Sequence, residues 1–491
     1  MKNTREKELK LLSAPRVRSR FFSLPAVRER IIAGSRHTLR LENVYYDTPD
    51  RRLAGAGLAY RIRCTDGKAW ECTVKTRGKT VGGFTDRGEY TLPLPSAEPV
   101  FSGFSEAVDA RLQEIVRRGA PQPFCKVVFT RRLALLQLNR QTVAEASVDE
   151  GSIEAGSRTA PIGEIELELK KGSGNDLLRF AADLAETVPL YPEKRSKLKR
   201  ALDLCGRGPS EAETDLVVPG TEDAFSAWRQ IALERIDSAF SEVTQCWQDE
   251  QYRCAGLADA LEEVAALWEW GRPLLSQRAY AEGRNLLAAA LPVLQPLREP
   301  EEGIRLLRKL SRDFAARALT EAWQKASRKE MEALRLALSR GGLAAALWRL
   351  WVLSGSRGRQ QDRVLTAEEF AAEALARNDT AFAAADTLPR ISTPRLRGEM
   401  IFLEHLEKQP AERFCRRARK YLKEVSRWEC IRGLCSKAQE LSRKEKGRAA
   451  GSEALVFKGY LLFVCGQVRR KVLKQGEKLQ KEKSQKNKNN I

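Results

Sequence analysis

Short segments in which charged and apolar residues alternate dominate the first 205 residues of the chain. In a β-strand, residues two apart point to the same face, so each segment places its charges in one row and its apolar side chains in the other. Residues 163–170, GEIELELK, put Glu164, Glu166 and Glu168 in one row and isoleucine and leucine in the opposite row. Such segments build an antiparallel sheet with one apolar face and one charged face.

The same alternation recurs along this part of the chain, with Gly, Pro and Asn/Asp turn signals between the segments. The predicted strands lie at residues 6–12, 59–64, 70–75, 87–94, 127–138, 143–149 and 162–170. Residues 107–118 and 176–187 have helical spacing of their apolar residues instead. These patterns predict an α+β fold for the first part of the chain.

A charged row on a single strand is most simply a face in solvent. Solvated faces mix Thr, Ser, Lys and Glu, whereas here arginine/lysine rows and glutamate rows lie on different strands. Like charges that share a face repel one another unless cations screen them. A sheet closed into a barrel with a charged interior uses this arrangement, because interior and exterior positions alternate along every barrel strand.

The two kinds of row suit two kinds of ligand. Guanidinium groups bind phosphate oxygens as a bidentate fork, so arginine rows suit a polyphosphate. Carboxylates supply the oxygen ligands that Mg²⁺ and similar ions prefer. The presence of both in one interior predicts a metal–phosphate complex bound between them.

These segments resemble the CYTH superfamily, the triphosphate tunnel metalloenzymes. Six motifs carry the resemblance in the family's order: ExExK at 6–10, NVYYDTPDRRLAGAGLAYRIR at 43–63, TVK at 73–75, GGFTDRGEY at 82–90, GEIELELK at 163–170 and SKLKR at 196–200. Tyr60 stands where the family's LRIR segment has Leu. The resemblance covers most of the first 205 residues and implies an eight-stranded antiparallel tunnel with a triphosphate at its centre.

The resemblance also implies roles for individual residues. The triphosphate would be bound by Lys10, Arg61, Arg63, Lys75, Arg87, Arg131 and Lys197. The metal, Mg²⁺ or Mn²⁺, would be bound by Glu6, Glu8, Asp149, Glu166 and Glu168, with Glu89 and Glu164 beside them. The expected catalytic residues are Glu6, Glu8, Lys10 and Glu168. Lys126 and Arg132 are alternatives to Arg131, because the sequence does not show which of the three faces the tunnel.

The composition changes after residue 205, and a chain of 491 residues is long enough for two or three domains. Residues 206–220, rich in Gly, Pro and acidic residues, are the predicted linker between a domain at 1–205 and an all-helical domain at 221–480. Long amphipathic helices are predicted at 301–326 and 455–479. The polar, low-complexity residues 481–491 are the predicted disordered basic tail.

The order of the two halves resembles bacterial inorganic triphosphatases, which join a CYTH domain to a C-terminal CHAD domain, a basic helical module that binds polyphosphate. Residues 221–480 share its length, helicity and charge, but His405 is their only histidine. The last 81 residues carry 23 lysines and arginines against 8 acidic residues, which is +15 of the chain's +21. A solvated face and an anion platform both explain this excess. Polyphosphate is favoured over nucleic acid, because the tryptophans are not interleaved with the basic residues.

We therefore expect a metal-dependent inorganic triphosphatase that hydrolyses tripolyphosphate to pyrophosphate and phosphate. The alternatives are a thiamine, nucleoside or RNA triphosphatase, an adenylyl cyclase of the same superfamily, or a polyphosphate-binding scaffold without turnover. The N-terminus has no signal-peptide core, and no apolar run approaches the ~18 residues that span a bilayer. The ten cysteines form no CxxC pair, so we expect reduced thiols and no zinc site in a cytoplasmic protein without a membrane partner.

Overall fold

The computed structural model describes most of the chain. The described residues are 2–206, 216–249, 255–292, 294, 299–310, 317–338, 340–358, 364–376, 393–407 and 411–489. They form two compact units, Met1–Glu213 with Arg340–Trp348, and Thr214–Ser339 with Arg349–Ile491. Most of the predicted linker therefore lies outside the described residues, and each unit is described by itself.

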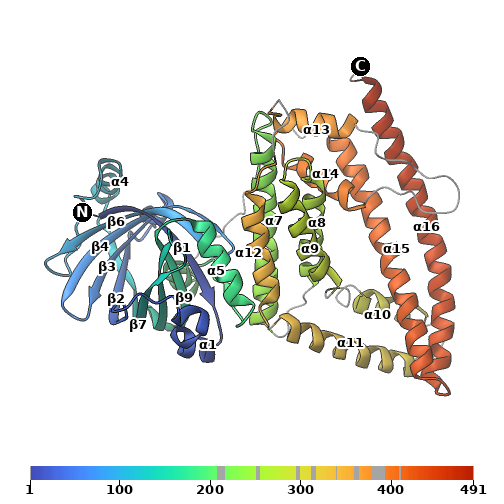
Figure 1. The fold of residues 1–491 in the computed structure, drawn as a ribbon, viewed down its shortest axis with the longest axis horizontal. Coiled ribbons are helices and arrows are strands. Elements are labelled where there is room, and N and C mark those ends of the chain that lie inside the picture. Colours follow the sequence, from blue (N-terminus) through green and yellow to red (C-terminus); the bar gives the residue numbers. More distant parts are fainter. Residues whose placement is uncertain are drawn as a thin grey trace. The chain divides into compact units, whose positions relative to one another are not determined.

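The first unit contains a closed antiparallel β-barrel (Figure 1). Its eight strands are β1 (Lys2–Leu12), β2 (His37–Asp47), β3 (Leu58–Thr65), β4 (Ala69–Thr76), β6 (Phe84–Leu94), β7 (Gln122–Gln137), β8 (Val143–Ala155) and β9 (Arg158–Lys171). Around the ring they follow the order β1-β9-β8-β7-β2-β3-β4-β6, and the pairing of β1 with β6 closes it. Two short strands, β5 (Lys79–Val81) and β10 (Tyr191–Pro192), pair with β6 and β1 beside the ring. The predicted eight-stranded antiparallel barrel is confirmed.

Strand β2 was not among the strands that charge alternation predicts. Its charged residues, such as Arg40 and Glu42, face outward, whereas Leu41, Asn43 and Tyr45 are its buried positions. Because this strand contributes no charged row to the interior, the pattern that marks the other strands is missing from it.

The outer surface of the barrel is covered on one side by helix α4 (Glu106–Arg117). Ser105 caps this helix, because its hydroxyl accepts a hydrogen bond from the Val108 backbone N–H. The helix then buries Val108, Leu112 and Ile115 against outward side chains of β3 and β4. The helices α1 (Pro15–Arg20), α2 (Pro25–Arg28), α3 (Arg52–Gly55) and α5 (Gly174–Ala185) complete the cover, together with the 3₁₀ turn Phe21–Ser23. This apolar shell leaves the opposite, interior face to the charged rows.

One end of the barrel interior is apolar. There Tyr45, Phe129 and Ile153 belong to a buried cluster that also contains Ala201 of helix α6 (Lys197–Leu204). The Ser196 hydroxyl caps α6 by accepting a hydrogen bond from the Lys199 backbone N–H at 3.0 Å. This cap fixes the start of the helix, and the first two helical residues, Lys197 and Leu198, line the barrel interior.

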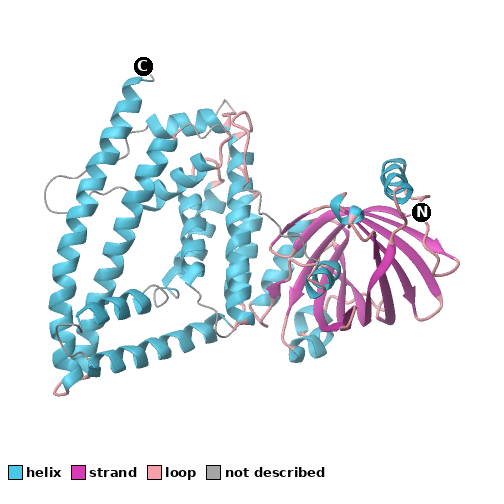
Figure 2. Ribbon diagram, turned by 180° about the vertical axis from the view of Figure 1, so that it is seen from behind, coloured by secondary structure: helices cyan, strands magenta, loops and turns pink. Residues whose placement is uncertain are grey.

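The described part of the second unit is helical (Figure 2). Its helices are α7 (Ala224–Gln248), α8 (Ala255–Trp270), α9 (Gln277–Ala290), α10 (Glu299–Leu310), α11 (Arg317–Leu338), α13 (Ala367–Ala376), α14 (Thr393–Glu404), α15 (Glu412–Lys444) and α16 (Ala449–Asn489), while α12 (Gly342–Ser354) contributes residues to both units. Tryptophans fill its core, as the edge-to-face contact of Trp228 with Trp268 at 5.7 Å illustrates. The single helix predicted at 301–326 corresponds to parts of two helices, α10 and α11. Residues 311–316 between them lie outside the described part.

Helix α16 differs from two expectations. The segment predicted as a disordered tail is helical as far as Asn489, consistent with its many lysines and glutamines, which are good helix formers. Within Ala449–Leu479 the mean hydropathy reaches 1.3, so this helix is long and apolar enough to cross a membrane by length and composition. Of the 18-residue window with this hydropathy, 33% is buried within the protein.

Candidate active site

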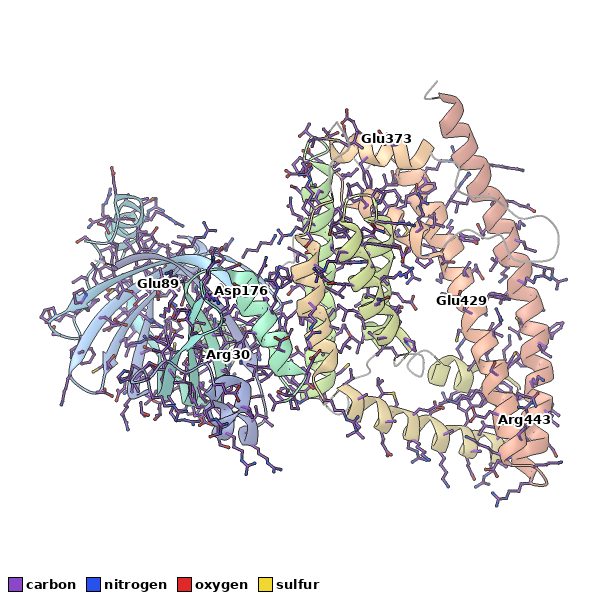
Figure 3. The ribbon with its side chains drawn as sticks, viewed as in Figure 1. Arg30, Glu89, Asp176, Glu373, Glu429 and Arg443 are labelled. Atoms are coloured by element: carbon purple, nitrogen blue, oxygen red, sulfur yellow. The ribbon has the colours of Figure 1, made fainter. Side chains whose placement is uncertain are left out.

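A cavity of about 240 Å³ occupies the barrel interior. Figure 3 draws the side chains of the barrel and labels Glu89, one of the lining residues. Of the twelve predicted site residues, eleven line the cavity: Glu6, Glu8, Lys10, Arg61, Arg63, Lys75, Arg87, Arg131, Glu166, Glu168 and Lys197. The twelfth, Asp149, is completely buried directly behind two of them, Arg131 and Lys197, and bonds to both.

Strand register brings the charged rows together. On β1, Glu6 stands opposite Arg87 of β6, while Glu8 and Lys10 stand opposite Glu168 and Glu166 of β9. Directly opposed residues on an antiparallel pair have Cβ atoms about 5 Å apart, within reach of an ion pair. Motifs separated by 80 to 160 residues in the sequence therefore meet inside one barrel.

A first group of ion pairs surrounds Glu6 and Glu8. Lys75 Nζ donates to Glu6 Oε1 at 2.7 Å, and Arg87 Nε donates to Glu6 Oε2 at 2.9 Å. Arg87 also donates to Glu8 at 2.8 Å, and Lys10 donates to the same carboxylate. Burial by itself raises the pKa of Glu6, but Lys75 and Arg87 outweigh it and hold that pKa at about 2. Burial likewise raises the pKa of Glu8, but Lys10 and Arg87 outweigh it and hold that pKa below its usual value, so both carboxylates are charged.

A second group lies deeper, around Lys197. Its Nζ lies 2.8 Å from Asp149 Oδ2, donates to Glu166 Oε1 at 2.9 Å and also bonds Glu164. Arg131 forms a bidentate pair with Asp149 at 2.7 Å for both bonds and also bonds Glu166. The two cations lie over the Phe129 ring, at 5.0 Å for Lys197 and 5.7 Å for Arg131.

The three carboxylates of this deeper group are close enough to share a metal ion. Asp149, Glu164 and Glu166 each offer an oxygen within 4.8 Å of the other two. Burial raises the pKa of Glu164, and the neighbouring Glu166 and Asp149 add to the effect. For Glu166, Lys197 and Arg131 outweigh burial and hold its pKa well below the usual value. This oxygen-only donor set fits a hard cation such as Mg²⁺ or Mn²⁺.

The structure resolves which cation of β7 faces the interior. Arg131 lines the cavity, whereas Arg132 pairs with Glu150 at 3.3 Å on the outer face. Lys126 pairs with Glu42 at 2.7 Å, and its side chain is 44% exposed. Strand alternation gives Arg131 and Arg132 opposite directions, but the sequence does not say which direction is inward.

The arginines of β3 make only long ion pairs, and Arg61 Nη2 lies 3.7 Å from Glu89 Oε1. Arg63 Nε donates to the Asn43 side chain at 2.8 Å, and Arg63 Nη1 reaches Glu71 at 3.5 Å. Burial, together with the like charges of Arg61 and Arg131, lowers the pKa of Arg63 to about 10. Within the described residues, Arg61 Nε is buried without a hydrogen-bond partner. A bound anion would relieve both the repulsion and the missing bond.

Sequence reasoning missed three charged residues of the cavity, Glu71, Glu145 and Lys170. Lys170 Nζ lies 2.8 Å from Glu168 Oε1 and 3.6 Å from Glu145 Oε2. The signal was present, because Glu145 lies four residues before Asp149 and Lys170 two residues after Glu168, each in the same strand row. Burial raises the pKa of Glu168, although Lys170 opposes the rise.

The model of the CYTH domain family matches residues 5–202. Residues 5–202 belong to this family. A curated inorganic triphosphatase of Haemophilus influenzae is 34% identical over 200 residues, which cover 40% of this chain and 53% of the relative. The chain thus matches about half the length of that relative.

Solved structures with similarity to this domain are more distant. A Hippeastrum adenylyl cyclase candidate, described as having a dominant triphosphatase activity, is 19% identical, covers 40% of this chain and 95% of its own, and has a TM-score of 0.28. A Pyrococcus horikoshii protein is 21% identical over 40% of this chain and 98% of its own, with a TM-score of 0.26. The Mimivirus capping enzyme triphosphatase is 12% identical, the match covers 37% of this chain and 86% of its own, and the TM-score is 0.24.

Proposed function

We propose that the CYTH domain is a metal-dependent inorganic triphosphatase that hydrolyses tripolyphosphate to pyrophosphate and phosphate. The observation that carries this proposal is the combination, in one small cavity, of arginine and lysine side chains with a cluster of buried carboxylates. A phosphate binder alone needs no carboxylate cluster, and a metal site alone needs no arginine row. The inorganic triphosphatase of Haemophilus influenzae supports the choice of reaction.

The cations of the cavity would bind the substrate. We assign phosphate oxygens to Lys10, Arg61, Arg63, Lys75, Arg87, Arg131 and Lys197. In the structure these cations hold carboxylates, so the interior is already ordered before an anion arrives. Arg61 and Arg63 would make the first bonds, because their ion pairs with Glu89 and Glu71 are long, at 3.7 and 3.5 Å, and Arg61 Nε has no hydrogen-bond partner within the described residues.

The carboxylates would bind the metal. We assign it to Glu6, Glu8, Asp149, Glu166 and Glu168, whose oxygens suit Mg²⁺ or Mn²⁺. A divalent ion held by these carboxylates would supply positive charge to neutralise the charge that develops on the phosphate oxygens. Glu168 lies closer to solvent than Glu166, with 28% of its side chain exposed against 10%. We therefore assign Glu168 to orienting the attacking water, while the surrounding cations hold the phosphate chain in line with it.

The size of the cavity favours an inorganic substrate. At about 240 Å³ it lies below the range of roughly 300–1,000 Å³ that is usual for drug-sized ligands. Fifteen of the twenty lining residues are charged, and Tyr45 is the one aromatic among them. A bare phosphate chain fits this lining better than a nucleoside or thiamine group, which would need an apolar surface for its ring.

For the helical second unit we propose a CHAD-like role in binding long-chain polyphosphate. Helices α15 and α16 carry exposed cations, among them Arg416, Lys420, Arg470 and Lys474. A polyanion would bind such a surface through phosphate contacts, with an affinity that falls as salt rises. We place the protein in the cytoplasm.

The test is a phosphate-release assay on the full chain. We expect release from tripolyphosphate, and not from ATP or thiamine triphosphate, with Mg²⁺ or Mn²⁺ and none with EDTA. Arg131→Met should abolish release, whereas Arg132→Met, which removes the same charge from the outer face, should retain it. Preference for ATP or thiamine triphosphate would replace the proposed substrate. No release from any of them, with tight binding of tripolyphosphate, would identify a scaffold.

A further inference from the structure

The interior row of β9 runs from the bottom of the cavity to solvent. Exposure of the side chains rises along it, from 0% at Glu164 and 10% at Glu166 to 28% at Glu168 and 32% at Lys170. Lys170 also lies at an irregularity of the strand, because Leu169 pairs with Ala144 and Lys171 with the adjacent Val143. Such bulges re-aim a side chain and are common next to active sites. Lys170 is thus the charged residue at the solvent end of this row.

Lys170 holds two carboxylates that stand opposite each other on neighbouring strands. Glu145 of β8 is paired in register with Glu168 of β9, and Lys170 Nζ bridges them at 3.6 and 2.8 Å. Like charges directly opposite on an antiparallel pair repel. The ammonium group between them removes that repulsion.

These two carboxylates have fewer cationic partners than the carboxylates deeper in the cavity. Glu6 and Glu166 each bond two cations, at least one of them an arginine. For Glu145 and Glu168, the ion pairs recorded in the described structure are all with Lys170. Lysine is a point charge on a flexible stem, whereas a bidentate arginine is held in a fixed geometry. Lys170 is therefore the cation of the cavity that is most easily displaced.

We propose that Lys170 is a built-in competitor of the divalent cation, which must displace it from Glu145 and Glu168 to enter the cavity. Glu145 then contributes a carboxylate oxygen to the incoming ion. This inference rests on the proposed use of a divalent metal, and it adds two residues that set the affinity for that metal. An ammonium group and a divalent cation that share the same two carboxylates repel each other across a partly desolvated site.

The test measures cation binding without substrate. Titration of the full chain with Mn²⁺, followed by calorimetry and by the electron paramagnetic resonance signal of the free ion, gives the dissociation constant directly. Lys170→Met should bind Mn²⁺ at least about tenfold more tightly than the wild type, since two carboxylates lose their competing cation. Glu145→Gln should bind it about tenfold more weakly.

Lys171→Met is the matched control. It removes the same charge from the next residue, which does not line the cavity, and its affinity should equal that of the wild type. Lys170→Gln is a second variant that keeps a hydrogen-bonding group without the charge, and it should bind as tightly as Lys170→Met. Melting temperatures within a few degrees of the wild type would establish that the variants are folded.

Unchanged affinity in both Lys170 variants would overturn the inference, as would an equal gain in Lys171→Met. These outcomes are separate from a failure of the proposed function, because Mn²⁺ affinity is measured whether or not tripolyphosphate is hydrolysed. If the protein hydrolyses tripolyphosphate but the Lys170 variants bind Mn²⁺ as the wild type does, the proposed function stands and the proposed competition by Lys170 is refuted.

Discussion

Replacing Lys197 with methionine removes the cation that three buried carboxylates share. Its Nζ lies 2.8 Å from Asp149 and 2.9 Å from Glu166, and it also bonds Glu164. At an effective dielectric constant of about 20, each such pair has a gross attraction of about 6 kcal/mol. The desolvation of the ammonium group offsets most of this, so we expect a net loss of about 3–5 kcal/mol, the usual cost of removing one partner of a buried pair.

The loss should depend on pH. Burial raises the pKa of Glu166, but Lys197 and Arg131 outweigh it and hold that pKa well below the usual value. A depressed folded pKa contributes stability above the unfolded pKa of about 4.3, and this stability is lost as pH falls through the folded value. Without Lys197 the folded pKa of this carboxyl group rises, so the variant regains stability by taking up a proton. The difference between wild type and variant should be smaller at pH 5 than at pH 8.

Hydrogen exchange of the β8 and β9 amides in the full chain, corrected for intrinsic rates, measures the opening free energy of this part of the barrel. Lys199→Met is the matched control on the same helix, because Lys199 pairs with Asp203 at 3.5 Å on a partly exposed surface. Lys199→Met should lower the opening free energy by less than about 0.5 kcal/mol. A loss below about 1 kcal/mol for Lys197→Met at pH 8, or an equal loss at both pH values, would refute the assigned role of this ion cluster.

Arg61→Lys should lower kcat/KM for tripolyphosphate about 100-fold in steady-state assays, because an ammonium cannot reproduce a bidentate bond; an unchanged value would remove Arg61 from the substrate site. Glu166→Gln should lower kcat at least about 100-fold while costing only about 1–2 kcal/mol in urea unfolding, because glutamine keeps the acceptor oxygen and loses the charge. Normal turnover of this variant at saturating Mg²⁺ would exclude the metal role. Because Lys75 and Arg87 outweigh burial and hold the pKa of Glu6 at about 2, its ion pairs stabilise the barrel above pH ~4.3 and are lost as pH falls towards 2. Glu6→Gln should remove about 3 kcal/mol of this pH-dependent stability, and acid unfolding curves that coincide with the wild type would contradict it.

Much of the barrel could be predicted from the sequence, because its interior is charged and its exterior apolar. That inversion of the usual pattern produced the alternating segments, and the alternation also indicated which residues share a face. Strand β2 was missed for the same reason, since its interior positions Leu41, Asn43 and Tyr45 are uncharged.

The partners of the site residues could not be predicted in the same way. Arg131 and Arg132 are adjacent, and only the register of β7 with β8 brings Arg131 opposite Asp149. Lys197 reaches the same carboxylate from a helix that begins 48 residues later, an approach that strand periodicity does not describe. Which carboxylates share a cation is therefore set by the closure of the barrel.

The two ends of the barrel interior differ, because one is filled with apolar side chains and the other opens towards solvent. Side chains of α6 and of the barrel wall, among them Ala201, Phe129 and Ile153, fill that end, while exposure rises towards Lys170 at the other. Because these described side chains are buried and fill that end, a long phosphate polymer could enter the cavity, under the proposed function, only from the Lys170 end. Only a chain terminus could reach the carboxylates, and the released products would have to leave by the route through which the substrate came. Under the proposed function, the domain would then shorten phosphate chains from their ends and would release each product before the next chain could enter.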